Sequence, residues 1–139
     1  MAGFSAEERA AMKAHAKELK LQEQGAEGLR MLLDAIAEMP DAERAIAERV
    51  HAIVSEVAPS LLPRTFYGFP GWAKNGKVLV FFQPATKFKT RYCTLGFQDG
   101  AALDDGILWP VSFAITGTDA ATERRIAELV ARAVGADPE

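Results

Sequence analysis

Thr-Phe-Tyr-Gly-Phe-Pro-Gly-Trp, at residues 65–72, is the stretch of this chain that decides its fold. Four aromatic residues, two glycines and one proline in so short a span are typical of a tight turn with aromatic walls. The apolar run Val-Leu-Val-Phe-Phe follows at residues 78–82, soon after Gly76. We therefore predict a turn that leads into a hairpin, with a bend at Gly76 and a strand over 77–83.

The predicted strand over 77–83 is apolar on both of its faces. Alternate residues share a face, which places three apolar side chains on one side and two on the other: Val78, Val80 and Phe82, and Leu79 and Phe81. A sheet with helices on one side only normally shows polar residues on its other side. Something must therefore cover the second face, and three candidates stay open: the N-terminal helix, the loop after Phe97, or a second subunit.

An accessory helix is predicted at the N-terminus. Ser5 and Glu8 have the spacing of a capping box, so the helix should begin there and end near Glu23. Gly25 and Gly28 then interrupt the helical pattern. The apolar stripe of this helix is narrow and consists of Met12, Ala16 and Leu19. We therefore expect a mostly exposed helix that docks through this stripe.

Two more helices are expected before the strands and one after them. The second helix buries one face, made by four residues with helical spacing: Leu29, Leu32, Leu33 and Ile36. It ends at Pro40, and Asp41 is the expected N-cap of the third helix. Further strands are expected over 90–97 and 109–116, and Thr118 or Asp119 caps a last helix. These elements predict an α+β fold, in which helices pack on one face of an antiparallel sheet of about four to six strands.

The composition is that of a single globular domain. The chain has 139 residues, of which 49% are hydrophobic and 25% charged, enough to bury one core. A net charge of −3 and a pI of about 5.5 weigh against nucleic acid as a partner. No run has the length of a membrane span, and the N-terminus lacks the apolar core of a signal peptide. Because Cys93 is the only cysteine, no intrachain disulfide forms, and we expect a cytoplasmic protein without membrane contact.

The aromatic residues and the cations near them are the first candidate site. The expected ligand-binding residues are Tyr67, Phe69, Trp72, Lys74, Lys87, Arg91 and Trp109. Aromatic walls with a few convergent cations suit a small anionic ligand or a peptide carboxylate, which predicts a small-molecule or peptide binding module. In the alternative interpretation, the rings fill one end of the sheet and the cations are solvated.

Several short segments occur together in an order that is found in one family. They are Ala58-Pro59, Tyr67-Gly68-Phe69-Pro70, Gly76-Lys77, Phe82 and Lys87-Phe88, within residues 26–134. In these segments the chain resembles the YdhG-like domains, also catalogued as domain of unknown function 1801. The resemblance implies a frataxin-like fold for a YdhG-like domain over 26–139. The accessory N-terminal helix over 1–25 is an addition to the pattern of this family. Some members are called iron chaperones, which implies a non-enzymatic role in passing labile iron to an iron-accepting protein.

A labile iron site would use hard carboxylate ligands together with imidazole. Glu48 and His51 lie at i and i+3 of the predicted third helix, so both side chains can reach one ion. In the alternative interpretation, Glu48 pairs with Arg44 on an exposed helix face. Cys93 lies in a strand pattern typical of a buried, unreactive thiol, and no serine is set as an activated nucleophile. We therefore expect no enzymatic activity, and a homodimer stays open because the N-terminal segment and the loop over 99–106 depart from the family.

Overall fold

The computed structural model describes Gly3 and residues 5–135, without the side chain of Leu21, and these residues form an α+β fold. One antiparallel sheet has the strand order β1-β2-β3-β4-β5, so each strand pairs with its neighbours in the sequence. The strands are β1 (Leu62–Phe66), β2 (Phe69–Lys74), β3 (Lys77–Gln83), β4 (Cys93–Phe97) and β5 (Ser112–Ile115). The helices are α1 (Ala6–Ala37), α2 (Asp41–Val57), α3 (Ala85–Phe88) and α4 (Ala120–Val134). The predicted fold class is confirmed, while the outer ends of the two expected domains, 1–2 and 136–139, lie outside the described residues.

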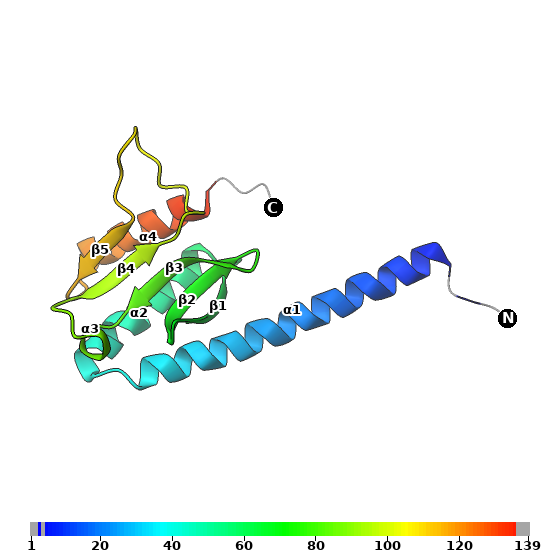
Figure 1. Cartoon of the computed structure of the whole chain (residues 1–139), viewed down its shortest axis with the longest axis horizontal. Helices are drawn as coiled ribbons and strands as arrows, with labels where there is room; N and C mark the ends of the chain where they lie inside the picture. Colours follow the sequence, from blue (N-terminus) through cyan, green and yellow to red (C-terminus); the bar gives the residue numbers. More distant parts are fainter. Residues whose placement is uncertain (1–2, 4, 136–139) are drawn as a thin grey trace.

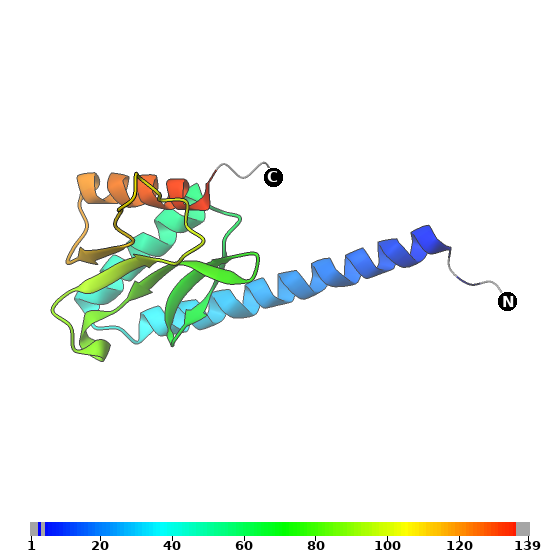
Figure 2. The same cartoon turned by 45° about the horizontal axis from the view of Figure 1, so that its top comes forward.

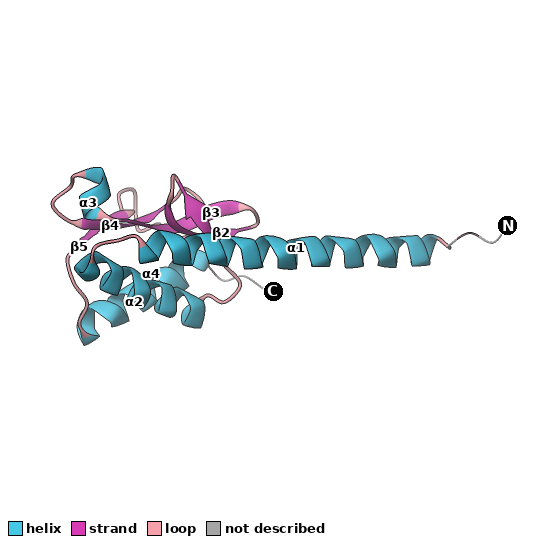
Figure 3. Cartoon of the chain, turned by 90° about the horizontal axis from the view of Figure 1, so that it is seen from below, coloured by secondary structure: helices cyan, strands magenta, loops and turns pink. Residues whose placement is uncertain are grey.

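The three long helices lie on one side of the sheet and the short α3 lies on the other (Figure 3). The core between the sheet and this helical layer contains many deeply buried side chains, among them Leu32, Ile36, Val50, Val54, Trp72, Val80, Phe82, Leu95 and Val130. Within the helical layer, Arg49 of α2 and Glu123 of α4 form a bidentate pair, with N–O distances of 2.7 and 3.1 Å. The sheet therefore has one face that is filled by helices and one face that they leave open.

Two tight hairpin turns shape the sheet around the aromatic stretch. Tyr67 and Gly68 both have positive φ angles, of 51° and 83°, and connect β1 to β2. Asn75 and Gly76 repeat this geometry between β2 and β3, with φ angles of 52° and 82°. Two consecutive residues with positive φ are typical of the type I′ turn, whose twist matches that of paired strands. The predicted bend at Gly76 and the strand over 77–83 are confirmed, and the aromatic stretch itself is a hairpin in which Phe66 pairs with Phe69.

Helix α1 runs without a break from Ala6 to Ala37, so the predicted end near Glu23 is wrong. Its start is as predicted, because the Ser5 hydroxyl accepts from the Glu8 amide at 3.1 Å and the Glu8 carboxylate accepts from the Ser5 amide at 2.9 Å. Gly28 does not interrupt the helix but lets it approach β1. A Cβ at this position would overlap the carbonyl oxygen of Pro63. The helix tolerates glycine here because the close approach offsets its cost of about 1 kcal/mol in helix propensity.

Only the second half of α1 packs on the body of the protein, and the first half projects away from it (Figures 1 and 2). Leu32 and Ile36 are buried as predicted, but Leu33 is 47% exposed, so the expected four-residue face is narrower than its spacing indicates. Met12 and Leu19 in the projecting half are also about half exposed. Among the described residues this stripe is exposed, as expected of a mostly exposed helix, and docking through it stays a prediction.

The ends of the other helices are set by different caps. Asp119 caps α4, accepting from the Thr122 amide at 2.7 Å, which confirms one of the two predicted caps. Asp41 is not the cap of α2, because Pro40 holds that position and no side chain caps the helix. The Asp41 carboxylate instead accepts from Arg44 at 2.7 Å, one turn along the helix.

The last two strands are shorter than predicted. The chain turns after α3 through Lys89, whose φ is 57°, and the Thr90 amide donates to the carbonyl of Ala85. Residues 90–92 therefore close α3 instead of pairing with β3. In the same way, residues 109–111 belong to the loop between β4 and β5.

Candidate functional site

The register of the sheet separates its residues into rows that face opposite layers. Arg64, Gly71, Phe81, Gly96 and Ser112 lie side by side across all five strands and face the open side. The two glycines of this row make room for rings. A Cβ on Gly96 would overlap the ring of Phe81, and a Cβ on Gly71 would lie 3.1 Å from Cβ of Phe66. The glycines of this row thus lie next to large side chains of the open face and leave space for them.

Aromatic side chains cover one end of the open face. The rings of Phe66, Phe69 and Phe81 contact one another, with centroids 5.5 to 5.7 Å apart. Phe88 of α3 packs edge-on against Phe69 at 5.4 Å. The second apolar face of β3 is therefore covered in part by rings of this chain, which the sequence did not suggest. The loop after Phe97, one of the three predicted covers, lies against β3 at Leu79, where a Cβ on Gly100 would be 3.5 Å from Leu79 Cδ1. Aromatic clusters add stability beyond the area they bury, by about 0.5–1.5 kcal/mol for each pair.

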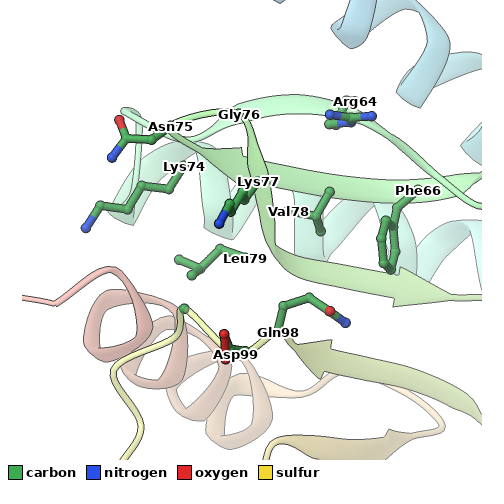
Figure 4. A pocket seen from close by; sticks show the side chains of 11 residues that line it. Arg64, Phe66, Lys74, Asn75, Gly76, Lys77, Val78, Leu79, Gln98 and Asp99 are labelled. Atoms are coloured by element: carbon green, nitrogen blue, oxygen red, sulfur yellow. The ribbon is translucent and has the colours of Figure 1, made fainter.

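Beyond these rings, the open face is hollowed into a groove of about 740 Å³. In Figure 4 the apolar floor, made by Phe66, Val78 and Leu79, lies between Arg64 and the wall formed by Gln98 and Asp99. The remaining lining residues are Lys74, Asn75, Gly76, Lys77 and Gly100. We call this hollow the open-face groove. Its floor is apolar and its rim is mainly cationic, an arrangement suited to a ligand with an apolar body and an anionic group.

The cations at this groove belong to a segment without acidic residues. Residues 57–98 contain six Lys and Arg and no Asp or Glu, whereas the rest of the chain holds ten basic and all 19 acidic residues. The net charge of −3 is therefore unevenly distributed: residues 57–98, which contain most of the sheet, are positively charged, and the rest of the chain is negatively charged. Arg64 and Lys77 are both exposed, so an anion from solvent can reach them, although Nε of Arg64 also donates to the carbonyl oxygen of Thr65 at 3.2 Å. This charge segregation is visible in the sequence, and it is the signal that would have drawn attention to both residues.

Lys74 lines the same groove but has a structural role as well. Its Nζ donates to the carbonyl oxygen of Val134 at 2.8 Å, at the C-terminal end of α4. The negative end of the helix dipole favours a cation at that place. Of the predicted rim residues, Lys74 is the one that the structure brings to the groove.

The expected aromatic cleft does not assemble from the residues named for it. Trp72 is 1% exposed and faces the helices, in the row opposite to that of its neighbour Gly71. Phe69 is also buried, and Trp109 lies partly buried in the loop after β4, packed against the core. Tyr67 is 81% exposed at the tip of the first hairpin. Alternation along β2 is the physical reason, because it directs the side chain of Trp72 into the core.

The other predicted cations lie near α3, away from the open-face groove. Lys87 and Arg91 are exposed, and each lies over the ring of the residue that follows it, at 5.9 and 5.2 Å from the centroid. Lys87 also lines a smaller hollow of about 260 Å³, together with Met39, Pro40, Gly68 and Phe69. This hollow lacks a second cation, so it is the weaker of the two candidate anion sites.

The predicted metal pair on α2 is divided between solvent and core. Glu48 is exposed, while His51 is half-buried and stacks on Trp72, whose Nε1 donates to His51 Nδ1 at 3.3 Å. Burial lowers the pKa of His51, which favours the neutral ring that this hydrogen bond requires. Only Nε2 of His51 is left for a metal. Among the described residues, no group of three or more His, Cys, Asp or Glu side chains is placed to hold a metal ion.

Two other titratable groups have structural roles. The Glu43 carboxylate accepts from the amides of Ala85 and Thr86, at 2.8 and 3.2 Å, and thereby holds α3 against α2. Burial opposes ionisation of Glu43, but the hydrogen bonds from Thr86 and Ala85 prevail and lower its pKa. Cys93 is buried and unpaired, and burial raises the pKa of its thiol, as its strand pattern predicts.

Comparison with known proteins leaves the site to be interpreted from its own geometry. No family model, no curated protein and no solved structure matches this chain. The resemblance to YdhG-like domains therefore stays a prediction. Within the described part of the chain, no helix combines the length and apolar character that crossing a membrane requires.

Proposed function

We propose that this chain is a cytoplasmic, non-catalytic binding module whose site is the open-face groove. One observation supports the proposal above all: an apolar floor and the exposed cations Arg64 and Lys77 share one groove, in which Asp99 is the single acidic residue of the lining. A ligand that fits both features has an apolar or aromatic body and an anionic group. Acidic apolar peptides and small aromatic anions have that character. The buried, unpaired Cys93 is in keeping with a reducing compartment.

In this proposal the floor of the groove supplies most of the affinity. Burial of an apolar side chain of the size of leucine contributes about 1.5–3 kcal/mol. An exposed ion pair contributes only about 0–1 kcal/mol, and salt screens it. The role of Arg64 and Lys77 is therefore to select and orient the anionic group. Binding is expected to weaken with ionic strength, but not to vanish.

Fluorescence titration with anilinonaphthalene sulfonate, an aromatic sulfonate, tests the proposal directly. We expect saturable binding to the dilute protein, and an affinity several-fold lower after Arg64→Gln and Lys77→Gln are combined. The matched control combines Lys13→Gln and Lys17→Gln on the exposed half of α1, which removes the same charge far from the groove. An equal loss in both variants would show an effect of overall charge and contradict the proposed site. Circular dichroism of each variant verifies that it is folded.

An anaerobic calorimetric titration with Fe²⁺ tests the iron-handling alternative that the YdhG-like resemblance implies. We expect no saturable heat that depends on Glu48, because its nearest predicted partner, His51, already has Nδ1 engaged with Trp72. Saturable Fe²⁺ binding that Glu48→Ala removes, at an unchanged melting temperature, would move the functional site to α2.

A further inference from the structure

The loop between β4 and β5 presents large apolar side chains to solvent. Ile107 is fully exposed and Leu108 is 88% exposed, while Trp109 beside them is only partly buried. Asp104 and Asp105 precede them and are exposed as well. Scattered exposed aliphatic side chains are ordinary, but two adjacent ones at a loop tip, next to a tryptophan, indicate a contact surface. We call residues 104–109 the loop tip.

The loop is anchored at its base, so the tip is held in a defined place. Ala101 and Leu103 are buried in the core. The Ala102 amide donates to the carbonyl of Ala133 at 2.9 Å, and Arg132 donates to the carbonyl of Asp104 at 3.3 Å. These contacts fasten the base of the loop to α4, and the tip stands away from the sheet (Figure 1). A fastened tip loses little conformational entropy when it binds.

The loop tip and the open-face groove are complementary in both charge and polarity. The tip joins two carboxylates to two aliphatic side chains, and the groove joins Arg64 and Lys77 to an apolar floor. We propose that the loop tip of a second copy of this chain occupies the open-face groove. Ile107 and Leu108 then cover the floor, and Asp104 and Asp105 meet the two cations. The inference rests on the proposed function, because it names the acidic apolar segment that the groove takes.

The placement of the two surfaces permits a closed dimer. The groove ends at Gln98, Asp99 and Gly100, and the loop continues from there. Groove and tip therefore lie at the same end of the sheet. Two copies facing each other about a two-fold axis can exchange tips, so that each copy gives one tip and receives one. Such self-complementary contacts close at two copies and do not propagate.

A charge-swap experiment tests the exchange. The tip variant combines Asp104→Lys and Asp105→Lys, and the groove variant combines Arg64→Glu and Lys77→Glu. By sedimentation velocity, wild-type protein should dimerise, and each variant alone should dimerise about tenfold or more weakly, because like charges then face each other. The equimolar mixture should regain the dimer, since both contacts in the mixed pair join opposite charges. Failure of the mixture to associate would overturn the proposal.

Apolar variants give a second measurement that does not depend on charge. Ile107→Ser combined with Leu108→Ser should leave a folded monomer, because neither side chain packs in the core. The matched control, Met12→Ser with Leu19→Ser, alters two exposed apolar residues of α1 and should leave the dimer intact. A wild-type monomer at every accessible concentration, or a dimer that the loop variant leaves unchanged, would refute the exchange.

Two further outcomes separate this inference from its alternatives. Co-sedimentation of monomeric wild-type protein with neutral phosphatidylcholine vesicles, lost in the Ile107 and Leu108 variant, would assign the tip to a lipid surface and overturn the dimer. Anilinonaphthalene sulfonate separates the two proposals. If it binds the groove but the wild-type protein is monomeric, only the exchange fails. If the mixture of the tip and groove variants associates, the tip variant by itself should bind anilinonaphthalene sulfonate more tightly than the wild-type dimer does. The reason is that no loop tip occupies the groove of the monomeric tip variant.

Discussion

The two faces of the sheet use the same strands in opposite ways. On the side of the helices, Pro63, Trp72, Val80 and Phe97 form one row, and three long helices cover it. On the open side, the neighbouring row contains Arg64, Gly71, Phe81 and Gly96. Large side chains bury most of the first face, whereas on the second, glycines alternate with larger residues and a groove is left beyond the rings. The comparison shows that Gly71 and Gly96 give space to side chains of the same face, and that the open-face groove is left beyond them, next to Arg64, where no helix covers the sheet.

The largest expected loss of stability comes from truncating a buried side chain on the face that the helices cover. Trp72→Ala should destabilise the protein by about 3–5 kcal/mol, because it removes a fully buried ring and leaves a cavity. Tyr67→Ala, at the exposed tip of the aromatic hairpin, removes mainly one edge contact with the ring of Phe66 and should cost no more than about 1.5 kcal/mol. Chemical denaturation measures both. Similar values for the two variants would contradict the contrast between the faces.

An intermediate effect is expected from filling the open face. Gly96→Ala places a methyl group against the ring of Phe81 and should destabilise the protein by about 1–3 kcal/mol. Phe81→Ala also destabilises the protein alone, because its ring contacts Phe66 and Phe69. If the clash is the cause, the double variant should be more stable than the sum of the two losses indicates. Simple additivity in a double-mutant cycle would argue against this close contact.

The smallest effect concerns a titration at the edge of the filled face. Burial lowers the pKa of His51 in the folded protein. The unfolded chain therefore takes up the proton first, so this contribution to stability is complete above about pH 6.5 and decreases as the pH falls below that value. His51→Gln keeps an acceptor for Trp72 but does not titrate, and it should lose less stability than wild type between about pH 7 and about pH 5.

The matched control for that titration is His15→Gln, since His15 is exposed on the projecting half of α1. Denaturation of the three proteins at several pH values gives the comparison. If His51→Gln and wild type lose stability in parallel, the burial of His51 is not the source of the pH dependence.

Local patterns in the sequence predicted much of the fold. The capping box at Ser5, the bend at Gly76 and the limits of β3 depend on neighbouring residues only, and all were predicted correctly. The continuity of α1 depends on a contact between Gly28 and Pro63, far apart in the sequence, so a glycine that permits close packing was interpreted as a break. Long-range contacts of this kind leave no periodic signal.

The candidate site was harder to predict than the fold. The direction of Trp72 depends on the register of the hairpin, which places Tyr67 and Gly68 in the turn and fixes the alternation along β2. Arg64 and Lys77 come from different strands, and only the completed sheet brings them to one groove. What the sequence does contain is the run of residues 57–98 without acidic side chains, a signal of charge distribution that periodicity does not capture.

The unbroken helix α1 has a mechanical consequence. An isolated helix of fewer than about 12–15 residues is marginal in water because its first turn is costly to form. Residues 25–37 pack against the rest of the protein and provide the helical nucleus. The projecting residues therefore only have to propagate a helix that has already formed. At about 1.5 Å per residue, residues 6–22 form a stiff rod of about 25 Å. A group joined to the start of this helix is therefore held at a fixed distance and orientation relative to the sheet. The projecting half of α1 acts as a rigid spacer and not as a flexible linker.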